Sequence, residues 1–358
     1  MDVHTAVAAS MLPASRAVVA AAFRELRHDD AAHGSASAFL ELLWSACRQS
    51  EALPPSTVSD VMAAAAAALE TGHRQGIVAI PLFDERYPPL LACIHDPPPV
   101  LWVRGDFETL ARPAVAVIGS RAASPYALQV GTRIAAELAE RGIVVVSGLA
   151  RGVDSAAHRG CLEVRGSTAA VLGCGLDRVY PPEHVDLASE IAGRGVLLAE
   201  LAPGAAPLPA HFPLRNRIIS GLSLATIVVE ASEHSGSLIT ARCALEQGRD
   251  VMAVPGSVLT GRNRGSHALL KDGARIVESA DDILSELGWP AARSGLEAPR
   301  KSLISGPLVD RMLPGECYDL DALVALTGLD GPAILARLTE LELAGVVAVS
   351  QGRYLRRS

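Results

Sequence analysis

Lysine is almost absent from this chain of 358 residues. Of its 32 basic side chains only Lys271 and Lys301 are lysines, which leaves 30 arginines. Neither lysine follows a G-x-x-x-x-G sequence, so a Walker A phosphate loop is excluded. Asp and Glu number 39, which gives a formal charge of −7. This charge balance excludes a wholly basic protein that coats nucleic acid, but it is compatible with a localised binding groove.

Paired cysteines and long apolar runs are also missing. The six cysteines form no C-x-x-C pair, which is typical of buried thiols in a reducing compartment and not of a disulfide framework or a zinc site. The longest apolar run, Val61–Leu69, is far shorter than the roughly 20 residues that span a bilayer. The N-terminus lacks the basic region of a signal peptide. We therefore expect a cytoplasmic protein without a membrane segment, a bound metal or a cofactor.

The length predicts two or three domains. Residues 1–75 are rich in Ala and Leu at helical spacing and predict a small helical domain. Residues 289–308 lose all periodicity and indicate a linker. Residues 309–358 show two helical patterns followed by two short strand-like runs around Gln351-Gly352, which predicts a winged-helix-like domain.

Residues 76–288 alternate short apolar runs with amphipathic helical stretches. Runs that are apolar on both faces are typical of a parallel sheet covered by helices on both sides, so we expect a large doubly wound α/β domain. The predicted strands are Ile77–Ile80, Val100–Val103, Val115–Ile118, Ile143–Val146, Ala169–Leu172, Val196–Ala199, Thr226–Val229, Val251–Val254 and Ala274–Val277.

Ligands of such sheets bind beyond the carboxyl ends of the strands, so we expect the binding residues in the loops there. Gly119, Ser120 and Arg121 follow one predicted strand and precede a helix that begins near Pro125. Glycine permits close approach of the backbone, the helix N-terminus supplies N–H groups, and arginine adds positive charge. The combination suits a phosphate, although a plain Gly-Ser turn with a solvated arginine would have the same sequence.

A second segment combines an aromatic side chain with basic ones. His211 and Phe212 precede Arg215, Asn216 and Arg217. An aromatic ring that stacks on a base, beside arginines that contact phosphates, is typical of single-stranded nucleic-acid binding. Alternatively, one of the two arginines neutralises a buried carboxylate, either Glu200 or Glu230.

Two later loops extend the candidate surface. Gly236, Ser237 and Thr240 open a helix with small residues, which predicts free N–H groups and hydroxyls for an anion. Arg262 and Arg264 follow the strand Val251–Val254. Residues 200–275 hold 8 basic and 6 acidic side chains, so a weakly positive region lies on an acidic body.

Two further loops are predicted to have a structural role. Asp154 follows Ser147-Gly148 and is expected to cap a helix, with His158 one turn inside it. The loop from Gly173 to Tyr180 reads as a rigid turn. Because no paired carboxylates or nucleophile elbow accompany these residues, we predict no catalytic residue.

Five segments in this order resemble the family of DNA-processing protein A, also called DprA or Smf. They are VAVIGSRAASPYA (115–127), VVSGLARGVDSAAHRG (145–160), GCGLDRVYPPEH (173–184), HFPLRNRIISGLS (211–223) and VVEASEHSGSLITARCALEQGRDVMAVPGS (228–257). The resemblance implies an extended Rossmann-like, mostly parallel sheet that binds single-stranded DNA, with an N-terminal SAM-like domain and a C-terminal winged-helix domain. It also implies a homodimer that loads RecA recombinase onto incoming DNA during natural transformation, with single-stranded-DNA-binding protein as a further partner.

The resemblance assigns DNA contacts to three motifs. They are Gly119, Ser120 and Arg121; Phe212, Arg215, Asn216 and Arg217; and Gly236, Ser237 and Thr240. Some relatives carry a DNA-contacting lysine three residues before the phenylalanine, where this chain has Pro209. His211, Arg262 or Arg264 would then compensate, or the affinity would be lower.

Two other functions are compatible with parts of the sequence. Nucleotide phosphoribohydrolases share a Rossmann variant with a small-residue phosphate loop, but their catalytic glutamate has no counterpart among Arg242–Ala244. A winged-helix transcription factor would read DNA with residues 332–344, whose charges are Arg337 against Glu340 and Glu342. That helix suits a major groove poorly.

Overall fold

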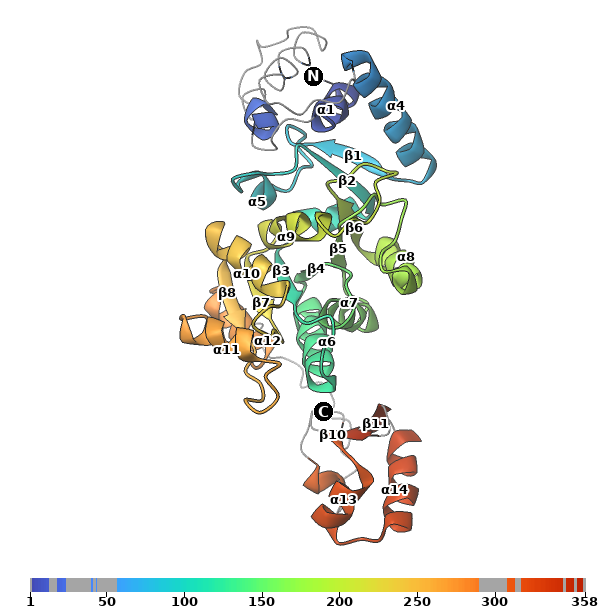
Figure 1. The fold of residues 1–358 in the computed structure, drawn as a ribbon, viewed down its shortest axis with the longest axis vertical. Coiled ribbons are helices and arrows are strands. Elements are labelled where there is room, and N and C mark those ends of the chain that lie inside the picture. Colours follow the sequence, from blue (N-terminus) through green and yellow to red (C-terminus); the bar gives the residue numbers. More distant parts are fainter. Residues whose placement is uncertain are drawn as a thin grey trace.

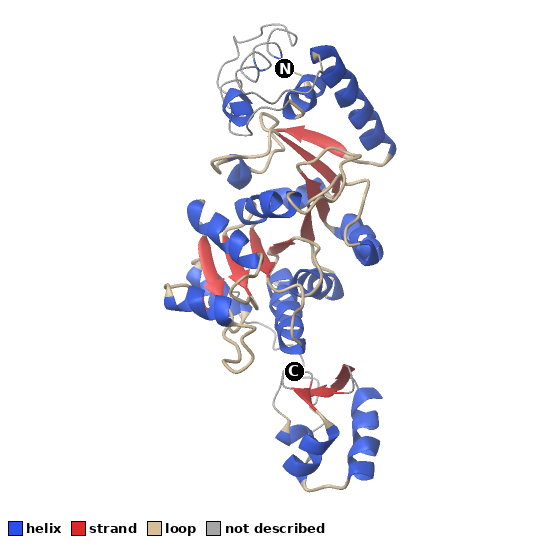
Figure 2. Cartoon of the chain, viewed as in Figure 1, coloured by secondary structure: helices blue, strands red, loops and turns tan. Residues whose placement is uncertain are grey.

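A computed structural model describes residues 2–12, 18–23, 40, 43, 57–289, 308–312, 317–343, 346–350 and 353–356 of the chain (Figure 1). The expected linker lies outside these residues except for its two ends. In the described part, strands are concentrated in one large sheet, and helices lie on either side of it (Figure 2).

Each of the nine predicted strands is present, and together they form one sheet. The strands are β1 (Val78–Pro81), β2 (Val100–Gly105), β3 (Ala114–Ile118), β4 (Val144–Ser147), β5 (Thr168–Leu172), β6 (Val196–Ala199), β7 (Ala225–Val228), β8 (Asp250–Ala253) and β9 (Arg275–Ile276). Their order is β1-β2-β6-β5-β4-β3-β7-β8-β9. The seven strands from β3 to β9 are parallel, whereas β1 and β2 add an antiparallel edge. The predicted mostly parallel α/β sheet is confirmed.

The strand order reverses at β3, which pairs with β4 on one side and with β7 on the other. The chain moves outward from β3 through β4, β5 and β6, then returns to the opposite side of β3 with β7. The loops that follow β3 and β7 therefore diverge, and a crevice opens between them. This is the position at which doubly wound sheets bind ligands.

Alternation along β3 shows that both faces of the sheet are covered. Val115 and Val117 belong to one hydrophobic cluster, whereas Ala116 and Ile118 belong to another. Since neighbouring strand residues point to opposite faces, each face has its own core. The helices of this region are α5 (Pro89–Ala92), α6 (Pro125–Glu140), α7 (Val153–Glu163), α8 (Val185–Arg194), α9 (His211–Gly221), α10 (Ser237–Glu246), α11 (Arg264–Lys271) and α12 (Ala280–Glu286), with 3-10 turns at Phe107–Ala111 and Pro182–His184.

The described N-terminal helices pack on the antiparallel edge of the sheet. Helix α4 (Val58–Arg74) begins at a capping box in which Thr57 and Asp60 exchange hydrogen bonds. Helix α1 (Val3–Ser10) and α4 share one hydrophobic cluster with β1 and β2, in which Trp102 is buried. The N-terminal helices therefore bury apolar surface against the sheet as well as against each other.

The C-terminal residues form a small unit with its own core. It contains a 3-10 turn at Val309–Arg311, β10 (Cys317–Tyr318), α13 (Leu320–Thr327), α14 (Gly331–Leu343), β11 (Val347–Ser350) and β12 (Arg353–Arg356). Strand β12 pairs with both β10 and β11. The predicted winged-helix pattern is present, and β10 is an addition because two residues are too few to produce a sequence signal. Taken singly, no described helix has the length and apolarity needed to cross a membrane; α13 and α14 meet that test only as a pair bent by 106°.

Candidate nucleic-acid interface

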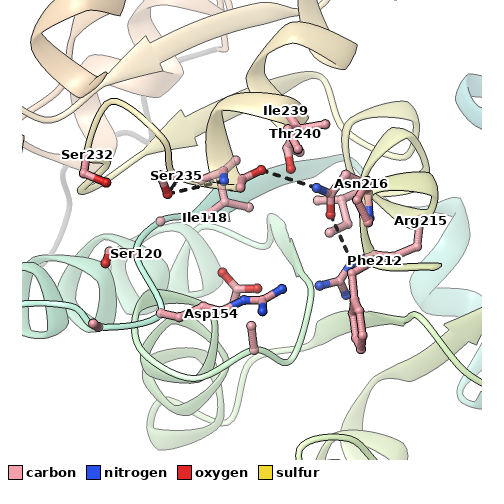
Figure 3. A pocket seen from close by; sticks show the side chains of 18 of the residues that line it. Ile118, Ser120, Asp154, Phe212, Arg215, Asn216, Ser232, Ser235, Ile239 and Thr240 are labelled. Atoms are coloured by element: carbon pink, nitrogen blue, oxygen red, sulfur yellow. Dashed lines mark hydrogen bonds between the residues drawn. The ribbon is translucent and has the colours of Figure 1, made fainter. Parts of the chain in front are cut away.

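A pocket of about 500 Å³ occupies the crevice between the loops after β3 and β7 (Figure 3). Its walls come from these two loops, from the loop after β4, from Tyr180 and from the first turns of α9 and α10. Its volume lies within the range of small-molecule sites. Nine of the thirteen predicted site residues line it: Gly119, Ser120, Arg121, Phe212, Arg215, Asn216, Gly236, Ser237 and Thr240.

The loop after β3 is held rigidly by Glu230. The Ser120 N–H donates to the Glu230 carbonyl at 2.8 Å. The buried Glu230 carboxylate accepts from the N–H of Ser124 at 3.0 Å and from its hydroxyl at 2.5 Å. A Cβ on Gly119 would lie 2.6 Å from the Val153 side chain, so this position admits only glycine without a shift. Glu230 thus shapes the loop and does not neutralise Arg215 or Arg217.

Three side chains in the pocket lining, Arg121, Phe212 and Tyr180, contact one another, with Phe212 in contact with both of the others. The guanidinium of Arg121 lies 5.6 Å from the centre of the Phe212 ring, within the range of a cation–π contact. The Tyr180 and Phe212 ring centres are 5.3 Å apart, with an interplanar angle of 45°. Tyr180 remains 39% exposed, so ring surface is available to a ligand. The prediction that the loop ending at Tyr180 is only a structural turn missed this ring, although an aromatic before two prolines was visible in the sequence.

Arg215 provides positive charge at the floor of the pocket. Its side chain is buried and donates to the carbonyls of Gly148, at 2.6 Å, and Val171, and to Oδ1 of Asn216 at 3.1 Å. Burial, assisted by the positive charge of Arg121, lowers the pKa of Arg215 to about 10. The guanidinium therefore stays charged at neutral pH. It lies beside the carboxyl ends of β4 and β5.

Asp154 is the one acid among the described lining residues. Burial raises the pKa of its carboxyl group, and the charge of Arg215 opposes that rise. The carboxylate accepts from the Gly148 N–H at 3.1 Å. The prediction that Asp154 caps the helix is wrong, because α7 begins at Val153 and Gly152 is its N-cap with φ of +79°. Asp154 lies within the first turn and instead holds the loop that contacts Arg215.

The start of α10 presents hydroxyl groups. The hydroxyls of Ser235 and Ser237 lie 2.7 Å apart, and both residues line the pocket with Thr240. The N–H groups of Leu238 and Ile239 donate to the carbonyls of Ser235 and Gly236. The prediction of bare N–H groups at this turn is therefore wrong for these two amides. Ser235, Ser237 and Thr240 bring three hydroxyl groups to the pocket wall.

Four predicted site residues lie outside the described pocket lining. The Arg217 side chain is only 7% exposed and bonds both oxygens of Glu200, at 2.8 and 3.1 Å, and Oδ2 of Asp96 at 2.9 Å. Arg217 therefore neutralises a buried carboxylate, that of Glu200, which is the alternative to a DNA contact. Nδ1 of His211 pairs with the Ala206 carbonyl at 3.1 Å. Arg262 lies on the loop after β8, and Arg264 is the first residue of α11.

No cluster of three or more His, Cys, Asp or Glu side chains suited to a metal ion occurs in the described ranges. Besides Asp154 and Asn216, the polar and aromatic groups that line the pocket are arginines, hydroxyls and aromatic rings. Such groups can hold a phosphate and stack on a base.

Comparison with known proteins identifies the family. The family model for DNA recombination-mediator protein A matches residues 78–288, which hold all nine strands of the sheet. The chain belongs to the DprA/Smf family. The model for the DprA winged helix domain matches residues 305–353.

Individual DprA and Smf proteins agree with this assignment. Protein Smf of Escherichia coli is 41% identical over 291 residues, which cover 77% of this chain and 76% of that protein. The DNA processing protein DprA of Bacillus subtilis is 44% identical over 216 residues, 60% of this chain and 73% of the relative. The X-ray structure of DprA from Streptococcus pneumoniae superposes with a TM-score of 0.69 at 34% identity, covering 80% of this chain and 98% of that one.

A second solved DprA structure, from Helicobacter pylori, is described as showing a single-stranded DNA binding mode. It has a TM-score of 0.54 and 31% identity and covers 59% of this chain and 95% of that protein. The shared DprA fold is thus shown for most of the chain.

Proposed function

We propose that this protein binds single-stranded DNA in the pocket between β3 and β7 and loads RecA recombinase onto the strand. One observation carries the DNA part of the proposal: Phe212 contacts both Arg121 and Tyr180, and all three line a pocket that has the buried Arg215 at its floor. The binding mode described for the Helicobacter pylori relative supports it.

The phosphate would lie between Arg121 and the loop at the start of α10. Arg121 is exposed and carries its charge over the Phe212 ring, and the hydroxyls of Ser235 and Ser237 lie on the opposite wall. Arginine and hydroxyl donors hold a phosphodiester without reading sequence. Little base preference is expected.

A base would stack on the exposed surface of Phe212 and Tyr180. Each base has an apolar ring face, and one base–aromatic stack contributes about 1–3 kcal/mol. In a duplex these faces are already stacked on neighbouring bases and are not available. Preference for single strands over duplex follows from this difference.

Binding without turnover is part of the proposal. Asp154 accepts a backbone N–H and Glu230 accepts two hydrogen bonds from Ser124, so both carboxylates hold loops in place. The alternative, a phosphoribohydrolase acting on a mononucleotide, requires an acid directed at the sugar. Incubation with nucleoside monophosphates should release no free base; sustained release that is lost in Asp154→Asn would favour the enzyme.

RecA, single-stranded-DNA-binding protein and a second copy of this chain are the partners we propose, on the strength of family membership. A symmetric homodimer would present two pockets to one long strand and raise the apparent affinity through avidity. Light scattering at micromolar concentration tests the dimer. RecA filament formation on strands coated with single-stranded-DNA-binding protein tests the loading.

Titration of the full chain with fluorescent oligonucleotides at several salt concentrations tests the DNA proposal. Arg121→Ala should weaken binding about tenfold and reduce the log–log salt slope by about 0.7, the value for one phosphate contact on a single strand. Arg74→Ala is the control, because Arg74 is 67% exposed on α4. Equal affinity for duplex, or an Arg121→Ala protein that binds like the wild type, would contradict the proposal.

A further inference from the structure

The loop after β8, residues 255–264 with the first residue of α11 included, is anchored at its base. It leaves the same edge of the sheet as the pocket loops, because β7 and β8 are parallel neighbours (Figure 1). The Tyr126 hydroxyl donates to the Pro255 carbonyl at 3.1 Å, and Nε2 of His267 lies 3.1 Å from the Gly256 carbonyl. The Asn263 side chain fills the space that a Cβ on Gly256 would need. The loop therefore has a defined base.

The tip of the loop carries two apolar side chains that the described structure leaves in solvent. Val258 is 79% exposed and Leu259 is 92% exposed, the highest value among the large hydrophobic residues described. Single exposed hydrophobic residues are common on protein surfaces. Val258 and Leu259 are adjacent in the sequence, so both add exposed apolar surface to the tip of this anchored loop.

The surroundings of the tip indicate an anionic partner. Residues 255–266 contain Arg262 and Arg264 and no Asp or Glu. Nη1 of Arg262 donates to the Ala122 carbonyl at 2.7 Å, and Ala122 lines the pocket. Arg264 is 67% exposed and lies 3.7 Å from Glu233, so most of its surface remains available. Positive charge and apolar surface thus continue outward from the pocket rim.

We propose that the loop 255–264 is the surface over which the DNA strand leaves the pocket. Val258 and Leu259 contact bases beyond the one held at Phe212, and Arg262 and Arg264 contact the phosphates between them. The inference rests on the proposed function. Charge and apolar side chains would also suit an anionic membrane, but the Arg262–Ala122 bond joins the loop to the pocket and favours the strand.

Dependence on strand length tests the proposal. Leu259→Ser should weaken binding of an oligothymidine of about 20 nucleotides roughly fivefold, and should leave an oligomer of about four nucleotides unaffected because that length fills only the pocket. Leu245→Ser is the matched control, since Leu245 is 60% exposed at the far end of α10. Thermal unfolding should show no shift for either variant, because both side chains are exposed.

A second variant should bind the DNA strand more tightly. Leu259→Trp places an aromatic ring at the tip and should tighten binding of the long oligomer about fivefold, with quenching of the new tryptophan fluorescence when DNA is added. A fluorescence change with the long oligomer alone supports the path over the loop. Equal affinities of wild type, Leu259→Ser and Leu259→Trp for the long oligomer would overturn it.

The failures of the two proposals are distinguishable. If the wild type binds neither oligomer, the proposed function fails and the inference fails with it. If Arg121→Ala weakens binding of both oligomers while Leu259→Ser weakens neither, the pocket is the DNA site and the loop is not. Loss of vesicle binding or of a dimer in Leu259→Ser, with DNA binding intact, assigns the tip to a membrane or a second copy and overturns the inference.

Discussion

The guanidinium of Arg215 lies in the space that a Cβ on Gly148 would occupy. The Gly148 carbonyl accepts a hydrogen bond from Arg215 at 2.6 Å, and the Gly148 N–H donates to Asp154 at 3.1 Å. The backbone of one residue, Gly148, thus connects the buried carboxylate of Asp154 to the buried guanidinium of Arg215. Only glycine lets the arginine lie flat against the backbone there.

Gly148→Ala should therefore displace Arg215. We expect about tenfold weaker binding of single-stranded DNA, because hydrogen bonds to a charged group contribute about 1.5–3 kcal/mol, and a loss of about 1–3 kcal/mol in the free energy of unfolding. Fluorescence titration and chemical denaturation measure the two effects. Gly193→Ala is the control, since no heavy atom lies within 4 Å of its Cβ position. Unchanged binding in Gly148→Ala would show that Arg215 has no part in the site.

Tyr180 should contribute to stacking through its ring and not through its hydroxyl. Tyr180→Ala is expected to weaken binding at least about fivefold, because it removes one stacking surface beside Phe212, whereas Tyr180→Phe should bind like the wild type. Binding is measured with poly-pyrimidine and mixed-sequence strands. Equal losses in both variants would instead assign the effect to the hydroxyl.

Pro209 lines the pocket, at the position where the family resemblance leads us to expect a lysine. Pro209→Lys should tighten binding about threefold to tenfold and add about 0.7 to the salt slope, because one more phosphate is neutralised. Pro209→Gln separates the added charge from the loss of proline. A Pro209→Lys protein with an unchanged salt slope would show that the strand does not pass this side of the pocket.

Arg217 should affect stability more than binding. Arg217→Ala removes the buried ion pair with Glu200, whose side chain is 12% exposed, and should lower the free energy of unfolding by about 3 kcal/mol. Arg217→Met combined with Glu200→Leu should recover most of this loss. Urea denaturation measures both. An Arg217→Ala protein of wild-type stability and weakened DNA binding would return Arg217 to the DNA-contacting set.

His158 should make the fold sensitive to acid. The Thr168 hydroxyl donates to the Val145 carbonyl, so Nδ1 of His158 must donate to Thr168, and the buried Nε2 has no partner in the described structure. Burial lowers the pKa of His158 to about 3, assisted by the positive charges of His184, Arg215 and Arg159.

The unfolded chain binds a proton at this histidine below about pH 6.5, and the native chain does so only near pH 3. As the pH is lowered from about 6.5 to about 3, the free energy of unfolding should therefore decrease, by up to about 1.4 kcal/mol per pH unit from this group. His158→Asn keeps a donor toward Thr168 and should reduce the pH dependence of the free energy of unfolding. Identical pH profiles for wild type and His158→Asn would contradict this account.

Local pattern was sufficient to predict the strands and most of the pocket. Strands such as β3 and β4 are uninterrupted apolar runs because both of their faces are buried. Such a run can be recognised in the sequence without knowing which strands lie beside it. Pocket residues such as Gly119 and Gly236 follow strands directly, and parallel strands bring their carboxyl ends to one edge. The family motifs lie in the same loops.

Pairings across the sheet were decided by the tertiary structure. Arg215 and Arg217 are two positions apart, which on a helix with 3.6 residues per turn places them about 200° apart, on nearly opposite faces of α9. The sequence therefore establishes that one of them can face the pocket, but not which one. The choice depends on the placement of Glu200 and Asp96, which come from distant segments and take Arg217 away from the pocket.

For Tyr180, too, the sequence predicts the loop, whereas the tertiary structure decides the contact. Its loop is marked by two prolines in the sequence, but its contact with Phe212 depends on β5 and α9 lying on the same side of the crevice. The sequence by itself determined the sheet, the winged helix and the loops that carry arginine and hydroxyl groups, because these follow from local burial and spacing. The tertiary structure decided which charges are neutralised and which rings stack, because both depend on distances between segments far apart in the chain.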